Sequence, residues 1–216
     1  MRNKVTVILL VMLAWCFAPT GAKGQLYDDP RMLSFENNDE LKTVQAEKCQ
    51  VELSTVHYKN GKSSLQWNFQ PGATLSFKQD LQFEPKIKGD RDNYLSAFIV
   101  WVYNEKPIAN KTVTFQFLKN GKVCTSFPFG INFKGWRGAW VCYERDMEGT
   151  PETGMNEIRI VAPDVKGKLF FDHMITAIKV DPRQQTADLQ VPFVNKKTTN
   201  HWLVVMQSYQ TKPDIA

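Results

Sequence analysis

The feature of this sequence that most constrains its fold is a series of short segments in which apolar and polar side chains alternate. Residues 65–69 are Leu-Gln-Trp-Asn-Phe, and residues 113–117 are Val-Thr-Phe-Gln-Phe. A period of two residues places every apolar side chain of such a segment on one face of a β-strand. Comparable segments recur as far as residue 180, and no stretch has a convincing helical period. The alternation therefore predicts an all-β protein.

Turn-forming dipeptides separate these segments. Asn-Gly occurs at 60–61 and at 120–121, and Pro-Gly occurs at 71–72. The pair at 120–121 predicts a tight hairpin, because both of its residues tolerate a positive φ. Eight or more short strands joined by such turns predict a two-sheet β-sandwich, with jelly-roll topology as the favoured form.

One segment is apolar on both faces. Residues 98–103 are Phe-Ile-Val-Trp-Val-Tyr, as expected for a central strand that is covered on each side. Trp67 and Trp101 both fall at strand centres. We therefore expect both indole rings in the core.

The N-terminal residues are typical of an export signal. Two basic residues precede an apolar run over residues 5–18, and Ala-Lys-Gly at 22–24 fits a cleavage site. The run is too short to span a membrane as a helix. We predict that residues 1–24 are a signal peptide, that the mature protein is periplasmic or extracellular, and that it has no membrane span. An uncleaved anchor and a lipoprotein signal at Cys16 are the alternatives.

The net charge gives little support for nucleic acid binding. The sequence has 27 Lys and Arg against 22 Asp and Glu, a formal charge of +5. Residues 1–24 hold three of these basic residues and none of the acidic ones, so the mature chain keeps 24 basic against 22 acidic residues. This near balance lacks the basic excess that is typical of nucleic-acid-binding domains. We expect no nucleic acid partner.

Three cysteines remain after the leader: Cys49, Cys124 and Cys142. An odd number permits at most one disulfide within the chain. Cys124 and Cys142 lie in consecutive strand-like segments and are the favoured pair. Three buried and unpaired cysteines are the alternative. No Cys or His spacing indicates a zinc site.

Four runs of residues carry a family resemblance. Residues 101–108 are Trp-Val-Tyr-Asn-Glu-Lys-Pro-Ile, and residues 133–137 are Phe-Lys-Gly-Trp-Arg. Phe-Phe-Asp-His-Met at 170–174 is followed by Asp-Pro-Arg at 181–183. Together these runs resemble the N-terminal domain of chondroitin sulfate ABC lyases, which are glycosaminoglycan polysaccharide lyases. The resemblance extends over about residues 32–194.

The resemblance implies a jelly roll similar to galactose-binding and carbohydrate-binding modules, joined to a helical toroid. In the family the toroid performs β-elimination at a uronic acid, in which a base takes the C5 proton and an acid assists the leaving sugar. We expect the sandwich at residues 25–183 and a tail at 184–216 that leads toward a toroid beyond this chain. We therefore expect no catalytic residue here and no lyase activity from the chain alone. His57, His173 and His201 accompany no nucleophile–base motif.

Three functions fit this resemblance. The favoured one is a non-catalytic domain that assists the binding of chondroitin or dermatan sulfate and packs on the catalytic toroid. A free-standing carbohydrate-binding module is the first alternative, and it requires an exposed aromatic platform. A purely structural docking domain is the second alternative, and it requires an apolar outer surface.

Aromatic and basic side chains are the candidates for sugar binding. Sugar rings present apolar C–H faces that stack on Trp and Tyr, and Arg or Lys pairs with sulfate or carboxylate. The candidates are Trp136, Arg137, Trp140 and Tyr143, together with Lys86, Lys88 and Arg91. Lys59 and Lys62 form a second basic turn. The alternative is that Trp136 closes one end of the sandwich, Arg137 forms a local salt bridge and the lysines are solvated.

Two acidic residues are the candidates for a structural Ca²⁺ site. The resemblance to sugar-binding jelly rolls implies that an acid in the first strand and another near the end of the fold hold the ion together. Glu36 and Asp172 occupy these places in the sequence. Carboxylate and backbone carbonyl oxygens are the ligands that Ca²⁺ prefers. The alternative is a pair of carboxylates that cap turns or lie at the surface.

Overall fold

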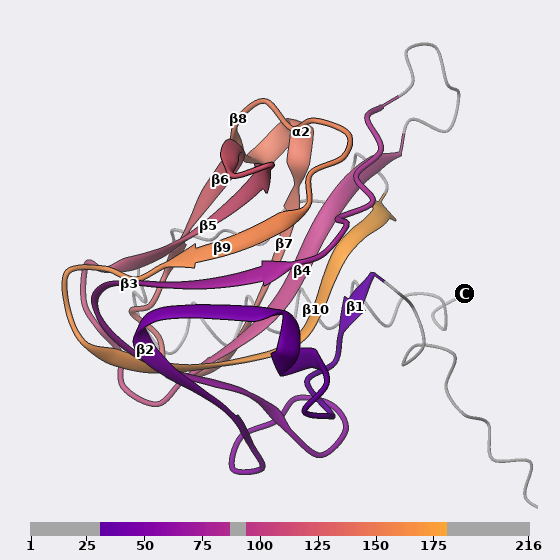
Figure 1. Cartoon of the computed structure of the whole chain (residues 1–216). Coiled ribbons are helices and arrows are strands. Elements are labelled where there is room, and N and C mark those ends of the chain that lie inside the picture. The colour runs from indigo at the N-terminus through magenta and orange to yellow at the C-terminus, as the bar shows by residue number, and fades with distance from the viewer. Residues whose placement is uncertain (1–30, 87–93, 181–216) are drawn as a thin grey trace, which may run out of the picture.

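The computed structural model describes residues 31–86 and 94–180, which form the all-β fold that the sequence predicts (Figure 1). The strands are β1 (Met32–Leu33), β2 (Val44–Ser54), β3 (Ser64–Lys78), β4 (Leu95–Asn104), β5 (Thr112–Lys119), β6 (Lys122–Gly130), β7 (Gly135–Cys142), β8 (Glu148–Gly149), β9 (Glu157–Val161) and β10 (Gly167–Val180). Two single-turn helices, η2 (Glu40–Thr43) and α2 (Tyr143–Asp146), accompany them. No helix in these two ranges has the length and apolarity to cross a membrane. The predicted leader, the tail at 184–216, Lys88 and Arg91 lie outside the described residues.

The strands form the two antiparallel layers of a β-sandwich with jelly-roll topology, as predicted. One layer, here called the β4 sheet, has the strand order β7-β4-β10-β3-β2, and β1 pairs with β10. The other layer has the order β3-β9-β5-β6-β8. Figure 1 shows β4 and β10 running side by side across the first layer. Strand β3 belongs to both layers, because its first half pairs with β10 and its second half with β9.

A bend in β3 carries the chain from one layer to the other. The sequence predicts a turn at residues 71–72, whereas in the structure β3 continues through them. Gly72 has a φ of 66°, which glycine adopts without steric cost. The partner strand β2 has a register shift between Glu47 and Cys49, where Lys48 has a φ of 54°. Paired bends in β2 and β3 therefore fold one continuous hydrogen-bonded sheet over the core.

The core between the layers is built largely of phenylalanine rings. Phe98 of β4 has ring centroids 5.8 Å from Phe115, 5.0 Å from Phe117 and 5.9 Å from Phe127. All four side chains are buried. Burying one such ring stabilises the fold by about 1.5–3 kcal/mol relative to exposing it. Trp67 is also fully buried, as predicted.

The hairpin predicted at residues 120–121 is confirmed. Lys119 of β5 pairs with Lys122 of β6, and two residues connect them. Asn120 has a φ of 51° and Gly121 a φ of 82°, as a type I′ turn requires.

All three described cysteines are free, so the predicted Cys124–Cys142 disulfide is wrong. Cys142 lies on the outward side of β7 in a small cluster with Leu95, Ala97 and Val180. Cys124 packs against the main core instead, and the two sulfurs therefore belong to different clusters. Burial raises the pKa of the Cys142 thiol to about 12, which keeps it protonated and unreactive at neutral pH.

Candidate functional site

The outward side of the β4 sheet carries a group of half-buried aromatic side chains, here called the aromatic face. It consists of Trp101 and Tyr103 of β4 and Trp136 and Trp140 of β7. Val100 and Val102 alternate with the first two and are fully buried in the core. Successive side chains of a strand point to opposite sides, so Trp101 and Tyr103 point outward. The prediction that Trp101 lies in the core is therefore wrong.

The strand register places all four rings on the same side of the sheet. Tyr103 lies opposite Trp136, and Trp140 lies opposite Ile99, two positions before Trp101. The rings of Tyr103 and Trp136 meet edge to face, with centroids 5.3 Å apart and an interplanar angle of 61°. This geometry is favourable for aromatic pairs and holds both rings in place.

One row of this face runs across five strands, from aromatic to polar side chains. The register aligns Trp136 of β7, Tyr103 of β4, Phe170 of β10, Gln66 of β3 and Glu52 of β2. The side-chain amide of Gln66 donates a hydrogen bond to Oε1 of Glu52 at 2.5 Å. The row therefore has aromatic rings at one end and hydrogen-bonding groups at the other.

The loop at residues 55–63, here called the covering loop, lies against the aromatic face. The imidazole of His57 stacks on Tyr103, with centroids 4.0 Å apart and an interplanar angle of 22°. It also meets the edge of Phe170, with centroids 4.9 Å apart. Its Nε2 lies 3.2 Å from Oε1 of Glu105. His57 thus joins the loop to the aromatic face through both ring packing and a polar contact.

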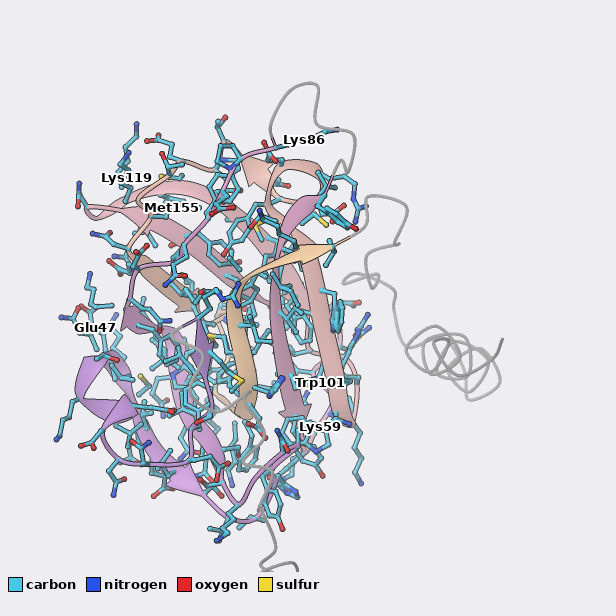
Figure 2. All side chains as sticks on the ribbon, turned by 90° about the vertical axis from the view of Figure 1, so that its right-hand side faces the viewer. Glu47, Lys59, Lys86, Trp101, Lys119 and Met155 are labelled. Atoms are coloured by element: carbon cyan, nitrogen blue, oxygen red, sulfur yellow. The ribbon has the colours of Figure 1, made fainter. Side chains whose placement is uncertain are left out.

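Lys59 of the covering loop lies over Trp101. Its Nζ is 4.3 Å from the centroid of the Trp101 ring, a cation–π contact. Figure 2 shows the two residues together toward one end of the sandwich. Gly138, opposite Trp101 on β7, leaves room for the indole, since a Cβ there would lie 3.3–3.4 Å from three successive ring atoms. Nearly equal distances to three successive atoms mean that Gly138 faces the plane of the ring.

Two carboxylates fix the covering loop by accepting hydrogen bonds from its backbone N–H groups. Oδ2 of Asp172 in β10 accepts hydrogen bonds from the backbone N–H groups of Lys59, at 2.5 Å, and Asn60, at 2.9 Å. The carboxylate of Glu36 accepts from the backbone N–H of Lys62 at 3.0 Å. A Cβ on Gly61 would lie 2.0 Å from Oε1 of Glu36, so any side chain at this position would require the carboxylate to move. The predicted alternative of turn-capping carboxylates describes this arrangement.

The two carboxylates also influence each other. Burial is the main cause that raises the pKa of Asp172, to about 6, and the negative charge of Glu36 raises it further. Hydrogen bonds from the backbone N–H groups of Asn60, Lys59 and His173 act in the opposite direction. Asp172 is only 1% exposed, so the loss of hydration outweighs these bonds.

The donor chemistry of this corner fits a hard cation. Glu36 and Asp172 supply carboxylate oxygens, which Ca²⁺ prefers. Phe35 has a φ of 56° and His173 a φ of 50°, so the backbone beside each carboxylate departs from regular strand geometry. Within residues 31–86 and 94–180 no group of three or more His, Cys, Asp or Glu side chains gathers. Backbone carbonyls would therefore supply the remaining ligands of a Ca²⁺ ion held by these two residues.

Comparison with known proteins identifies the family. Residues 29–193 match the family model described as "Lyase, N terminal". The chain belongs to this family. The resemblance seen in the sequence motifs is thereby confirmed, and it extends over nearly all residues that the structure describes.

Two curated relatives of this lyase N-terminal domain are much longer proteins. A chondroitin sulfate ABC exolyase of Bacteroides thetaiotaomicron is 57% identical over 207 residues, which are 96% of this chain and 20% of the relative. A chondroitin sulfate ABC exolyase of Proteus vulgaris is 36% identical over 168 residues, which are 77% of this chain and 15% of the relative. The chain thus spans a fifth of the first relative and less of the second.

Among solved structures, an exo-β-agarase superposes on the lyase N-terminal domain with a TM-score of 0.53. The match covers 72% of this chain and 25% of the agarase, at 9% sequence identity. An identity this low supports a shared fold and nothing further.

The structure brings together only some of the predicted sugar-binding residues. Trp136 and Trp140 lie on the aromatic face. Arg137 lies on the opposite side of β7, where its guanidinium is 5.7 Å from the Phe129 ring and 5.6 Å from the Phe133 ring. Arg137 therefore does not share the aromatic face with Trp136, because neighbouring residues of a strand face opposite sides.

Two further candidates for sugar binding, Tyr143 and Lys86, do not lie on the aromatic face. Tyr143 is fully buried at the start of α2, and its hydroxyl donates a hydrogen bond to the carbonyl of Thr176 at 2.6 Å. The prediction that Tyr143 stacks on sugars is therefore wrong. Lys86 is exposed, and Figure 2 places it at the end of the sandwich opposite Lys59. Its backbone N–H donates to Oε2 of Glu144 at 2.9 Å, so it lies beside α2.

The sequence analysis missed the centre of the aromatic face. It assigned Trp101 to the core and gave Tyr103 and His57 no binding role. The signal that identifies Trp101 and Tyr103 is the alternation of aliphatic and aromatic side chains at residues 100–103, combined with the knowledge that one side of β4 faces no second layer. His57 has no such signal, because the covering loop reaches the face only in the folded protein.

Proposed function

We propose that this lyase N-terminal domain is a non-catalytic carbohydrate-binding domain that holds a sulfated glycosaminoglycan on its aromatic face. The observation that carries the proposal is the group of four half-buried aromatic rings on one side of the β4 sheet. Ring faces of Trp and Tyr bind the C–H faces of sugars, and nearby polar groups bind hydroxyls. The names of the relatives point to chondroitin sulfate as the ligand to test first.

Charged side chains at the edge of the aromatic face support an anionic ligand. Lys59 lies over Trp101, and Nζ of Lys168 lies 3.7 Å from Oε2 of Glu105. Both lysines are exposed. Lysine pairs with sulfate and carboxylate groups through charge-assisted hydrogen bonds. Chondroitin and dermatan sulfate carry both groups on alternating sugars.

Titration of the full chain with chondroitin sulfate oligosaccharides tests the proposal. Trp136→Ala should weaken binding about five-fold, because one stacked ring contributes about 1 kcal/mol. Tyr94→Ala is the matched control, since Tyr94 is 50% exposed and precedes β4 at the end opposite Tyr103. No measurable binding by the unsubstituted chain, or equal affinity of the two variants, would contradict the proposal. Thermal melting of each variant shows that the fold is intact.

A second role, packing on the catalytic part of a longer lyase, is favoured by a separate apolar cluster. Leu95, Ala97, Cys142 and Val180 form this cluster on the outward side of the β4 sheet, and Ile178 packs against it. It lies outside the main core, at the end of β10. The four cluster members are at most 8% exposed, so half-buried Ile178 is the member that a partner could contact. The proposed partner is the catalytic domain of the same lyase.

Co-elution with the catalytic part of the Bacteroides thetaiotaomicron exolyase tests this second role. The unsubstituted chain should co-elute with it, and Ile178→Asp should abolish the association by placing a charge in the apolar contact. Val123→Asp is the control, because Val123 is 41% exposed on β6 of the other layer. Association that survives Ile178→Asp, or none with the unsubstituted chain, argues against docking through this cluster.

The proposal includes export and a structural Ca²⁺ ion. Export rests on the leader sequence at residues 1–24, and N-terminal sequencing of the protein secreted by its source should begin at Gln25. The Ca²⁺ ion rests on the proximity of Glu36 and Asp172, which place two carboxylates beside one loop. A bound cation would relieve the repulsion between them.

A further inference from the structure

The exposed side of the Trp101 ring is occupied by a charged group of the protein itself. One face of the ring lies over Gly138 of β7 at van der Waals distance. The Nζ of Lys59, 4.3 Å from the ring centroid, fits only on the other face. That face is the one on which a sugar would stack. Lys59 therefore occupies a binding position of the aromatic face.

The backbone of Lys59 is fixed, whereas its side chain is not. Its N–H donates to Oδ2 of Asp172 at 2.5 Å, and the N–H of Asn60 donates to the same oxygen at 2.9 Å. The residue as a whole is exposed. Across the two described ranges, Lys59 forms no salt bridge, and its ammonium group contacts the ring of Trp101. The ammonium can leave the ring without breaking an ion pair.

We propose that Lys59 is a displaceable cover that makes Trp101 selective for acidic sugars. The inference rests on the proposed function and assigns a selectivity mechanism to the same face. A neutral sugar that stacks on Trp101 must displace the ammonium and gains nothing from it. An acidic sugar displaces it too, but its carboxylate or sulfate then pairs with the displaced ammonium through a charge-assisted hydrogen bond. The cation–π contact thus opposes neutral sugars and is replaced when an acidic sugar binds.

The strength of the Lys59–Trp101 contact determines how far neutral sugars are disfavoured relative to acidic ones. A cation–π contact at an exposed site corresponds to about a two- to five-fold change in affinity. Pairing of the ammonium with an anionic group favours binding by about ten- to twenty-five-fold, which replaces the lost cation–π contact and leaves a net gain of about five-fold. The Trp136 ring contacts Tyr103, and among the residues that the structure describes no cation lies over it as Lys59 lies over Trp101. Selectivity for charge is therefore a property of the Trp101 position.

The test compares three forms of one polymer on the full chain and on its variants. The ligands are chondroitin sulfate, desulfated chondroitin, and desulfated chondroitin whose carboxyl groups are reduced to neutral alcohols. Lys59→Ala uncovers the ring, whereas Lys59→Arg keeps a cation over it. Lys122→Ala is the matched control, because Lys122 is an exposed lysine at the start of β6 in the other layer. Affinities are measured by titration at low and at high salt.

We expect Lys59→Ala to change the affinities for the neutral polymer and for chondroitin sulfate in opposite directions. Lys59→Ala should bind the neutral polymer about two- to five-fold more tightly than the unsubstituted chain does. It should bind chondroitin sulfate about five-fold more weakly and with a smaller salt dependence. Lys59→Arg and Lys122→Ala should change neither affinity by as much. If desulfated chondroitin behaves like chondroitin sulfate, the uronate carboxylate is the group recognised, and if it behaves like the neutral polymer, the sulfate is.

Three outcomes overturn the inference, and they are separable from failure of the proposed function. If Lys59→Ala weakens chondroitin sulfate binding and leaves the neutral polymer unchanged, Lys59 is a simple anion contact. If it weakens both equally, Lys59 is structural. In these two cases glycan binding by the aromatic face still stands. If the unsubstituted chain binds none of the three polymers, the inference and the proposed function both fail.

Discussion

Oδ2 of Asp172, near the middle of the last strand, accepts a hydrogen bond from the backbone N–H of Lys59 at a distance of 2.5 Å, although 113 positions separate the two residues in the sequence. This bond holds the covering loop against the β4 sheet. The same loop carries His57, which stacks on Tyr103, and Lys59 itself, which lies over Trp101. The positions of His57 and Lys59 on the aromatic face therefore depend in part on one buried carboxyl group.

The stability of the metal-free protein should depend on the protonation of Asp172. Burial raises its pKa to about 6 in the folded state, above its ordinary value. The folded state therefore takes up a proton more readily than the unfolded state, and stability from this group is complete below about pH 4 and lost as pH rises through about 6. In EDTA buffer, the free energy of unfolding should fall by about 2 kcal/mol between about pH 4 and pH 7.5 through this group.

Asp172→Asn isolates this contribution, because asparagine keeps an acceptor oxygen for the two N–H groups but does not titrate. Urea unfolding of both proteins is measured across the pH range, and the difference between the two curves is compared. The difference should change between about pH 4 and about pH 6, which are the unfolded and folded pKa values of this group, and should be constant above about pH 7. A constant difference at all pH values would show that Asp172 ionises normally.

Addition of Ca²⁺ should stabilise the EDTA-treated chain and weaken its dependence on pH. A cation between Glu36 and Asp172 favours the charged form of both carboxyl groups. At a Ca²⁺ concentration about 100 times the dissociation constant, stabilisation is about 2.7 kcal/mol, which raises the melting temperature by several degrees. Differential scanning calorimetry measures this shift. Glu36→Gln should reduce it strongly, and an unchanged melting temperature of the unsubstituted chain would exclude the ion.

Alternation of side chains predicted most strands but not β2. The inward residues of β2 include Cys49, Val51 and Leu53, which are only partly buried because β2 lies at the edge of the layer. Gln50 and Glu52 alternate with them, so the segment does have the period of two residues, which the sequence analysis missed. At residues 71–72 the sequence predicts a turn that ends the strand, because Pro-Gly is a turn signal. In the structure this pair bends β3 without ending it.

The candidate site was predicted by residue type and not by position. Trp136 and Trp140 were chosen because their strand follows a turn, and they do share one side of the sheet, yet the same reasoning included Arg137, which faces the other side. Strand register decides which neighbours share a face, and register is fixed by pairing with β4. The contacts of Asp172 and Glu36 with the covering loop join distant segments, so no local pattern reveals them.

Gly61 should be intolerant of substitution, in contrast to Gly72. Both have a positive φ, 68° and 66° respectively, so a change to alanine strains either backbone by about 1–2 kcal/mol. A Cβ at Gly61 also lies 2.0 Å from Oε1 of Glu36, whereas a Cβ at Gly72 meets nothing within 4 Å. Gly61→Ala should therefore lower the free energy of unfolding by at least about 1 kcal/mol more than Gly72→Ala does. Urea unfolding compares the two variants, and equal losses would mean that Glu36 moves aside freely.

Gly61→Ala should also weaken glycan binding, because it displaces the loop that carries His57 and Lys59. Affinity for chondroitin sulfate is measured under conditions in which the variant remains folded. Gly72→Ala should bind as the unsubstituted chain does, since Gly72 lies in the bend within β3, nine or more positions from the covering loop. Reduced affinity in Gly72→Ala alone would contradict the assignment of the covering loop to the site.

Tyr143 should contribute to stability and not to glycan binding. Its ring is fully buried between Phe83 and Phe117, with centroids 5.1 and 5.0 Å away, and its hydroxyl donates to the carbonyl of Thr176 at 2.6 Å. Tyr143→Phe keeps the ring and removes the hydrogen bond, so the free energy of unfolding should fall by about 1–2 kcal/mol.

The matched control for this change is Tyr94→Phe, because Tyr94 is 50% exposed and its loss of a hydroxyl should alter stability by less than about 0.5 kcal/mol. Urea unfolding gives the two free energies, and titration with chondroitin sulfate gives the affinities. Tyr143→Phe should bind with unchanged affinity, since its ring is separated from the aromatic face by β4 and β7. A marked loss of affinity in Tyr143→Phe, at temperatures where it is folded, would instead place the binding surface at the α2 end of the sandwich, near Lys86.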